Sequence, residues 1–163
     1  MRYTTKTEYG LNCLIFLAKG KNDIVNINEI SQEENYSRTY IEKILQNLRA
    51  GEIIKSHKGK QGGYSLSRDP SDITLKDIIE ALEGSTFDVF CDPPTHKDIV
   101  CTHHGLCGVR PIWMKTKELL DHFFQSITLE MLVQEENKVS HQLHQDPMIK
   151  LEKLAKRFEE ISP

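Results

Sequence analysis

The fold is decided by residues 37–66, which read SRTYIEKILQNLRAGEIIKSHKGKQGGYSL. The first half carries an apolar stripe with the spacing of one helix face, made of Ile41, Ile44, Leu45 and Leu48. Ser37 is a suitable N-cap for this helix, and Gly51 is suited to the C′ position after its end. Two short strand-like runs, 53–57 and 64–66, then flank a glycine-rich tip. The stretch therefore predicts a helix followed by a β-hairpin.

Two helices are predicted before this stretch. The first begins with a capping box formed by Thr5 and Glu8, carries an apolar stripe at Leu11, Leu14, Ile15 and Ala18, and ends at Gly20. The second is short, running from a cap at Asn26 to about Glu33, and a tight turn separates it from the helix of residues 37–51. Helix, helix-turn-helix and hairpin in this order are typical of a winged helix, in which the third helix enters the major groove of DNA. We expect a mainly α fold with a small β-hairpin wing.

The chain is predicted to have four parts: a DNA-binding domain at 1–84, a cysteine-containing loop at 85–109, a dimerisation helix at 110–136, and a linker with a C-terminal helix at 137–163. Pro111 suits the first position of the long helix. Its apolar residues are Ile112, Trp113, Leu119, Leu120, Phe123, Phe124 and Ile127. Because a lone arm cannot bury them, they indicate a homodimer, with packing inside the monomer as the alternative.

The charge is unevenly distributed along the chain. Residues 1–68 hold 11 Lys and Arg against 7 Asp and Glu, whereas the remainder holds 10 against 17. The total is −3, but the amino-terminal half carries +4, which favours an electropositive face for nucleic acid. With 38% hydrophobic residues and no long apolar run or signal peptide, we expect a soluble cytoplasmic protein. The sequence has no cofactor loop or nucleophile motif, so we expect no enzyme.

Three of the four cysteines lie in a loop that is long for a compact domain: Cys91, Cys101 and Cys107. In a cytoplasmic protein such thiols are free or bind metal. Soft thiolates suit an iron–sulphur cluster, but zinc with a loop histidine and a bare thiol switch are alternatives. The intervals of nine and five residues fit poorly with the closely paired cysteines of zinc ribbons. Cys13 lies inside the first helix and is predicted to be a buried structural thiol.

Four motifs resemble the Rrf family of bacterial transcription regulators: MRYTTK at 1–6, SRTYIEKIL at 37–45, GGYSL at 62–66 and ITL at 127–129. The resemblance extends from Met1 to about Glu136. It implies a homodimeric winged helix-turn-helix repressor that binds a pseudo-palindromic operator in double-stranded DNA. IscR-like and NsrR-like members carry a 2Fe-2S or 4Fe-4S cluster on three cysteines, so the resemblance implies a sensor of redox, nitric oxide or iron–sulphur status.

By this resemblance the cluster ligands are Cys91, Cys101 and Cys107, although the first interval is longer than is usual in the family. IscR-like proteins add a histidine three residues after the last cysteine, and Arg110 stands there in this chain. NsrR-like proteins take a carboxylate from the first helix of the opposite subunit, where Glu8 matches. The rival donors are His96, His103 and His104.

The predicted DNA contacts come from the third helix and the wing. They are Ser37, Arg38, Thr39, Tyr40, Glu42, Lys43, Gln46, His57, Lys58 and Lys60. The resemblance assigns Glu42 to a cytosine amine and Lys58 to the place of a minor-groove arginine, while Arg38 and Lys43 suit phosphates. Simple solvation of these polar residues is the alternative interpretation.

Overall fold

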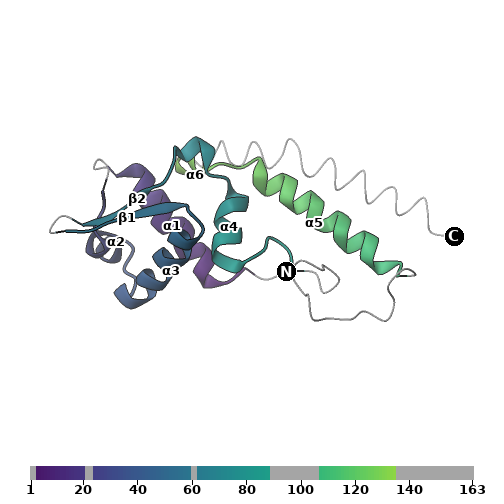
Figure 1. Cartoon of the computed structure of the whole chain (residues 1–163), viewed down its shortest axis with the longest axis horizontal. Helices are drawn as coiled ribbons and strands as arrows, with labels where there is room; N and C mark the ends of the chain where they lie inside the picture. Colours follow the sequence, from purple (N-terminus) through teal and green to yellow (C-terminus); the bar gives the residue numbers. More distant parts are fainter. Residues whose placement is uncertain (1–2, 21–23, 60–61, 89–106, 135–163) are drawn as a thin grey trace.

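The three predicted helices of the winged helix, its hairpin and the long helix are present in the computed structural model, which describes residues 3–20, 24–59, 62–88 and 107–134. The elements are α1 (Thr5–Lys19), α2 (Ile27–Glu33), α3 (Arg38–Ala50), β1 (Ile54–His57), β2 (Gly63–Leu66), the 3-10 turn η1 (Pro70–Asp72), α4 (Leu75–Glu83), α5 (Val109–Gln125) and α6 (Leu129–Val133). Helices α1 to α4 and the hairpin form one body, and α5 extends away from it (Figure 1). The mainly α fold with a small wing is confirmed.

The core lies between α1, α3 and α4, and the whole apolar stripe predicted for α3 is buried in it. The buried face of α1 consists of Thr7, Gly10, Cys13, Leu14 and Leu17. This face is rotated from the predicted one because Gly10 lets α4 approach closely: a Cβ there would lie 2.5 Å from Leu82 Cδ1. Each fully buried aliphatic side chain stabilises the body by roughly 1.5–3 kcal/mol.

The predicted capping box at the start of α1 is wrong. The N-cap is Thr4, which makes no side-chain capping bond. Instead, the hydroxyls of Thr4 and Thr7 donate to Glu83 Oε1 at 2.6 and 2.5 Å. Thr5 is already inside the helix, and Glu8 is exposed on its first turn. The start of α1 is thus held by the end of α4 rather than by its own side chains.

The predicted N-caps of α2 and α3 are confirmed. Asn26 accepts from the backbone N–H of Asn28 at 2.9 Å, and Ser37 accepts from that of Tyr40 at 3.3 Å. Thr74 forms a complete capping box at the start of α4. These caps satisfy backbone donors that have no partner within their own helices.

Gly51 does not adopt the left-handed conformation expected of a C′ glycine. Its φ is −82°, and the next residue, Glu52, has the positive φ of 58°. A side chain at residue 51 would collide with α4, since a Cβ there would lie 2.5 Å from Ala81 Cβ. The glycine therefore serves close packing of α3 against α4.

The wing is an antiparallel hairpin in which Ile54 pairs with Leu66 and His57 with Gly63. Val25, just before α2, adds a bridge to Tyr64, with both N–H···O distances 2.9 Å. A Cβ at Gly63 would lie 2.3 Å from the Val25 carbonyl oxygen, so this approach needs glycine. The bridge anchors the wing beside the helix-turn-helix.

The long helix α5 begins at Val109, so Pro111 is its third residue rather than its first. Proline is tolerated there because the first-turn N–H groups lack helical partners. After Gln125 the chain bends back, and α6 packs against α1. We call residues 3–88 and 126–134 the head, and α5 the arm.

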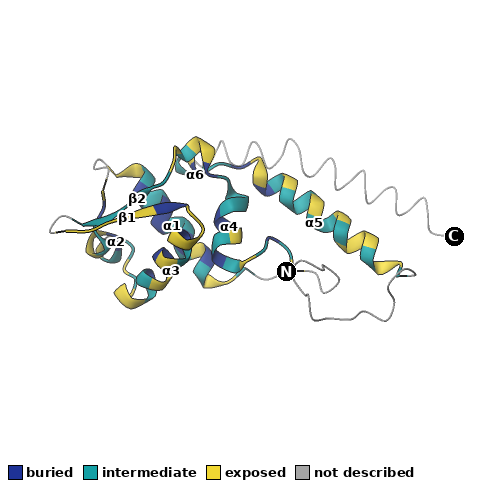
Figure 2. Ribbon diagram, viewed as in Figure 1, coloured by how far each residue is buried: buried dark blue, intermediate teal, exposed yellow. Residues whose placement is uncertain are grey.

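Most of the arm's side chains are not buried (Figure 2). Only Phe124, near its junction with the head, is buried. Within the described ranges, no helix is long and apolar enough to cross a membrane. The predicted C-terminal helix lies outside these ranges.

Candidate nucleic-acid interface

The recognition helix α3 presents most of its predicted DNA-contacting residues to solvent. Ser37, Arg38, Thr39, Lys43 and Gln46 are exposed, as are His57 and Lys58 in the wing. Glu42 and Tyr40 are half-buried. Lys60 lies outside the described residues. Seven of the ten predicted side chains are therefore available to a ligand without rearrangement.

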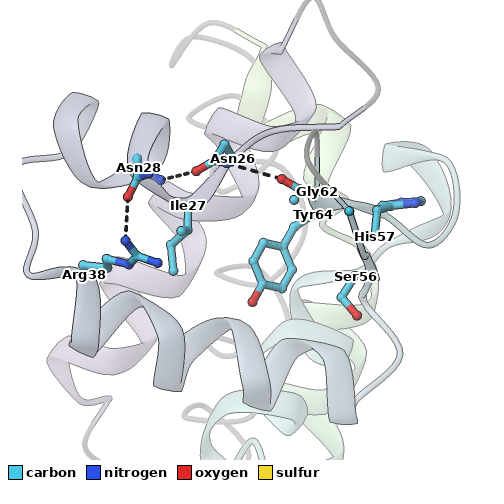
Figure 3. A pocket seen from close by; sticks show the side chains of 10 residues that line it. Asn26, Ile27, Asn28, Arg38, Ser56, His57, Gly62 and Tyr64 are labelled. Atoms are coloured by element: carbon cyan, nitrogen blue, oxygen red, sulfur yellow. Dashed lines mark hydrogen bonds between the residues drawn. The ribbon is translucent and has the colours of Figure 1, made fainter.

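A polar groove of about 310 Å³ separates the helix-turn-helix from the wing (Figure 3). Arg38 lines one wall and His57 another, so the structure brings these two predicted residues to one site. The lining also includes Asn26, Asn28, Ser56 and Tyr64. A groove between a recognition helix and a wing can receive a strand of nucleic acid backbone.

Polar contacts link the two sides of this groove. Arg38 Nε donates to Glu42 Oε1 at 3.2 Å, and Arg38 Nη1 donates to Asn28 Oδ1 at 3.1 Å. Asn28 N donates to Asn26 Oδ1 at 2.9 Å, and Asn26 Nδ2 donates to the Gly62 carbonyl at 3.3 Å (Figure 3). We call these contacts the Glu42–Gly62 chain. Sequence reasoning treated Asn26 only as a cap and missed Asn28, because neither contact is local.

Aromatic side chains fix the turn of the helix-turn-helix to α1. The rings of Tyr9 and Tyr36 are stacked, with centroids 3.7 Å apart, and Tyr40 meets Tyr9 edge-on at 5.6 Å. Asn12 Nδ2 donates to the Tyr36 hydroxyl at 2.8 Å. Tyr40 therefore contributes to packing at the amino end of α3 in addition to any contact with DNA.

The wing carries basic side chains on a short two-stranded support. His57 Nε2 and Ser65 Oγ lie 2.8 Å apart, within hydrogen-bond distance across the strands. From the last turn of α3, Arg49 Nη1 donates to Ser56 Oγ at 3.4 Å. The first contact joins the two strands of the hairpin, and the second holds the hairpin near the recognition helix.

The cysteines have different environments. Cys13 is fully buried in the core, and burial raises the pKa of its thiol to about 12, with the nearby Glu34 carboxylate adding to the effect. Its predicted structural role fits this position. Cys107 is a free, half-buried thiol just before α5. Cys91 and Cys101 lie outside the described residues.

The side chain of Glu8, the predicted fourth ligand, is exposed and makes no hydrogen bond or ion pair with the part of the chain that the structure describes. Arg110 is half-buried in the first turn of α5. Among the described residues, no group of three or more His, Cys, Asp or Glu side chains could hold a metal ion. The rival donors His96, His103 and His104 lie outside those residues.

The arm joins the head through a buried polar contact. The Thr86 hydroxyl, which is almost fully buried, donates to Asp121 of α5. Lys117 and Lys76 place their ammonium groups 3.2 and 3.8 Å from Asp121 Oδ2. The Tyr3 hydroxyl donates to the Thr86 carbonyl at 3.1 Å. Burial, followed by the Asp121 charge, raises the pKa of Tyr3.

The fold and the groove together define a winged helix-turn-helix DNA-binding protein. The chain belongs to the Rrf2 family, whose model, described as an iron-dependent transcriptional regulator, matches residues 3–135. The protein is accordingly a DNA-binding transcription regulator and not an enzyme.

Individual relatives cover most of the chain. It is 33% identical to the HTH-type regulator CymR of Bacillus subtilis over 135 residues, which cover 81% of this chain and 89% of that one. It is 30% identical to IscR of Klebsiella pneumoniae over 148 residues, covering 89% and 88%. The solved structure of B. subtilis CymR, described as the global cysteine regulator, matches with a TM-score of 0.61 and 30% identity, covering 82% of this chain and 96% of that one.

Proposed function

We propose that the protein is a homodimeric repressor whose DNA binding depends on an iron–sulphur cluster held by Cys91, Cys101, Cys107 and Glu8. The observation that carries the proposal is the position of Cys107, a free and partly accessible thiol that immediately precedes the arm. A ligand bound there is connected directly to α5. The other two loop cysteines belong to the same connection between α4 and α5.

The donor set fits such a cluster. Thiolates are the usual ligands of iron in iron–sulphur clusters, and a carboxylate supplies a labile fourth position. Glu8 is exposed and is not engaged in the capping bond expected of it. Cys13 is unsuitable because its buried thiol resists ionisation. When bound, the cluster would supply sensitivity to oxidants, nitric oxide or iron–sulphur status.

The arm favours a homodimer. Val109, Ile112 and Trp113 are 52%, 44% and 43% exposed, which is unusual for large apolar side chains gathered on one helix. A second copy of the same helix can cover them through a symmetric interface. The resemblance to NsrR-like regulators implies that such a dimer would bring Glu8 of one subunit to the cysteines of the other.

For DNA binding, we place α3 in the major groove and the wing against the neighbouring backbone or minor groove. Ser37, Thr39 and Glu42 then approach base edges, while Lys43 and the wing residues His57, Lys58 and Lys60 approach phosphates or the minor groove. Gln46 lies further along the exposed side of α3. Two such heads on a dimer fit a pseudo-palindromic operator in double-stranded DNA.

The junction between arm and head connects the cysteines with the recognition helices, so the state of the cysteines can control DNA binding. Cys107 is continuous with α5, and Asp121 of α5 contacts Thr86 of the head. A change in how the cysteines are held would alter the angle of the arm. It would thereby alter the separation of the two recognition helices, on which affinity for spaced half-sites depends.

A regulator of the same fold that works without a cluster, through zinc or a thiol switch, is the second candidate. The similarity to CymR, described as a global cysteine regulator, favours it. The loop cysteines would then act as reversible thiols or zinc ligands.

Anaerobic purification of the full chain tests the two candidates. We expect visible iron–sulphur absorption and matching amounts of iron and sulphide, both lost in Cys101→Ser. Cys13→Ala is the matched control, because it removes a cysteine from the core and should retain the absorption. Glu8→Ala should leave the cluster assembled but change its spectrum and speed its loss.

A colourless protein with stoichiometric zinc, or one without metal, would contradict the cluster and favour the second candidate. Retention of the full spectrum in Cys101→Ser would reject the proposed ligand set. Unchanged spectra and cluster lifetime in Glu8→Ala would exclude Glu8 as the fourth ligand.

A further inference from the structure

The Glu42–Gly62 chain connects the side chain assigned to base reading with the tip of the wing. Arg38 is the residue next to Glu42 in this chain: its Nε donates to Glu42 on α3, and its Nη1 donates to Asn28 on α2 (Figure 3). The two contacts use different nitrogens, Nε and Nη1, of the planar Arg38 guanidinium. The chain thus spans the recognition helix, the first turn of α2 and the wing.

We propose that Arg38 is a positioning residue that holds Glu42 in the orientation needed to read a base pair. This inference rests on the proposed function of α3 in DNA recognition. It gives Arg38 a role in sequence selectivity, beyond the phosphate contact expected of an exposed cation.

The contacts of Arg38 restrict the rotamers of the Glu42 side chain. An unrestrained glutamate on an exposed helix face samples several rotamers, and fixing one of them costs conformational entropy. An exposed i,i+4 ion pair alone restrains it only weakly. Here Arg38 Nη1 also donates to Asn28 Oδ1, and the backbone N–H of Asn28 donates to Asn26 Oδ1. The second anchor restricts the arginine and therefore the carboxylate that it holds.

Arg38 also balances the negative charge of Glu42 near DNA. A carboxylate that enters the major groove approaches the negative field of the phosphates. Arg38 offsets this charge, and its side chain remains 60% exposed while that of Glu42 is 44% exposed. Arg38 and Glu42 can therefore approach DNA as an ion pair. Glu42 then accepts a hydrogen bond from a base amine while the positive charge of Arg38 stays beside it.

A lysine at position 38 would keep the positive charge but lose the planar guanidinium. It has a single ammonium group in place of the planar fork, so it cannot reproduce the two directed contacts of Arg38. Arg38→Lys is therefore the informative variant. Lys43→Gln is the matched control for charge, because Lys43 is exposed on the same helix and has no contact with Glu42 among the interactions of the described residues.

The test uses anaerobically purified full-length protein. Operator duplexes are first selected from a randomised DNA pool, and binding is then measured to the selected duplex and to duplexes with single base-pair substitutions. The base pair that Glu42 reads is identified by comparing the discrimination of Glu42→Gln with that of the wild-type protein. At that base pair, Arg38→Lys should lower discrimination about 5- to 10-fold, while affinity for unrelated duplexes changes less than about twofold.

Lys43→Gln should instead weaken binding to all duplexes by a similar factor. Once Glu42 is replaced by Gln, adding Arg38→Lys should cause no further loss of discrimination. Asn28→Ala, which removes the anchor and keeps the charge, should reproduce part of the loss.

Wild-type discrimination in Arg38→Lys, or an equal loss at every base pair, would overturn the positioning role while leaving DNA recognition by α3 intact. Failure of the wild-type protein to select any duplex would overturn the proposed function itself. Circular dichroism of each variant checks that the exposed substitutions leave the fold unchanged.

Discussion

The head and the arm use apolar side chains in opposite ways. In α3, four apolar residues are fully buried in the core of the head, whereas the longer α5 buries only Phe124. The head completes its own core from elements of one chain. The arm exposes Ile112 and Trp113, which the second arm of the proposed homodimer would cover. The apolar residues of the head therefore stabilise the fold of one chain, whereas those of the arm are available for the proposed dimerisation.

The largest expected effect is on the free energy of unfolding of the head. Leu45→Ala removes most of a fully buried side chain from the core, so it should lower that free energy by about 3 kcal/mol. Ile112→Ala on the arm is the matched control and should cost less than about 0.5 kcal/mol at concentrations where the protein is monomeric. Urea denaturation measures both. Equal losses of unfolding free energy in the two variants would mean that arm and head share one core, contrary to the difference described above.

The second effect concerns assembly. Trp113→Glu places a charge on the exposed apolar face of α5, and we expect the dissociation constant of the dimer to rise at least about 30-fold. Sedimentation velocity over a range of concentrations measures it. His122→Gln, which changes an exposed residue on another side of α5, should leave the constant within about twofold. An unchanged dimer in Trp113→Glu would locate the interface elsewhere.

The same comparison explains which features the sequence could predict. The α3 stripe and the Ser37 cap follow from interactions within a few residues, so periodicity and capping rules identify them. The wing was predicted for the same reason, since its strands are consecutive in the chain. The rotated face of α1 was not predicted, because it depends on the approach of Leu82 from α4.

Long-range contacts account for the parts of the site that sequence reasoning missed. Arg38 meets Asn28 ten residues away, and Asn26 meets Gly62 thirty-six residues away. Neither pair has a local pattern, and asparagine before a helix already has a sufficient explanation as a cap. The cysteines were found by residue type and spacing alone. Their ligand roles remain a prediction.

The smallest effect tests the junction between the start of α1 and the end of α4 in the head. Burial raises the pKa of Glu83, but hydrogen bonds from Thr4 and Thr7 and the charge of Lys6 outweigh it, so the net shift is downwards from 4.5. The ionised carboxylate is therefore stabilised by folding. Its contribution is present above the pKa of the unfolded chain and is lost as pH falls through the lower pKa of the folded state.

Glu83→Gln should consequently lower the free energy of unfolding by about 1 kcal/mol at pH 7, because it removes the charge from these hydrogen bonds while keeping an acceptor oxygen. The difference from wild type should shrink as pH is lowered below 4.5, since protonation then removes the same charge from the wild-type protein. Urea denaturation across this range measures it. Glu80→Gln, an exposed change on the same helix, is the control. A difference that stays constant down to pH 3 would show that the Glu83 charge does not hold α1 to α4.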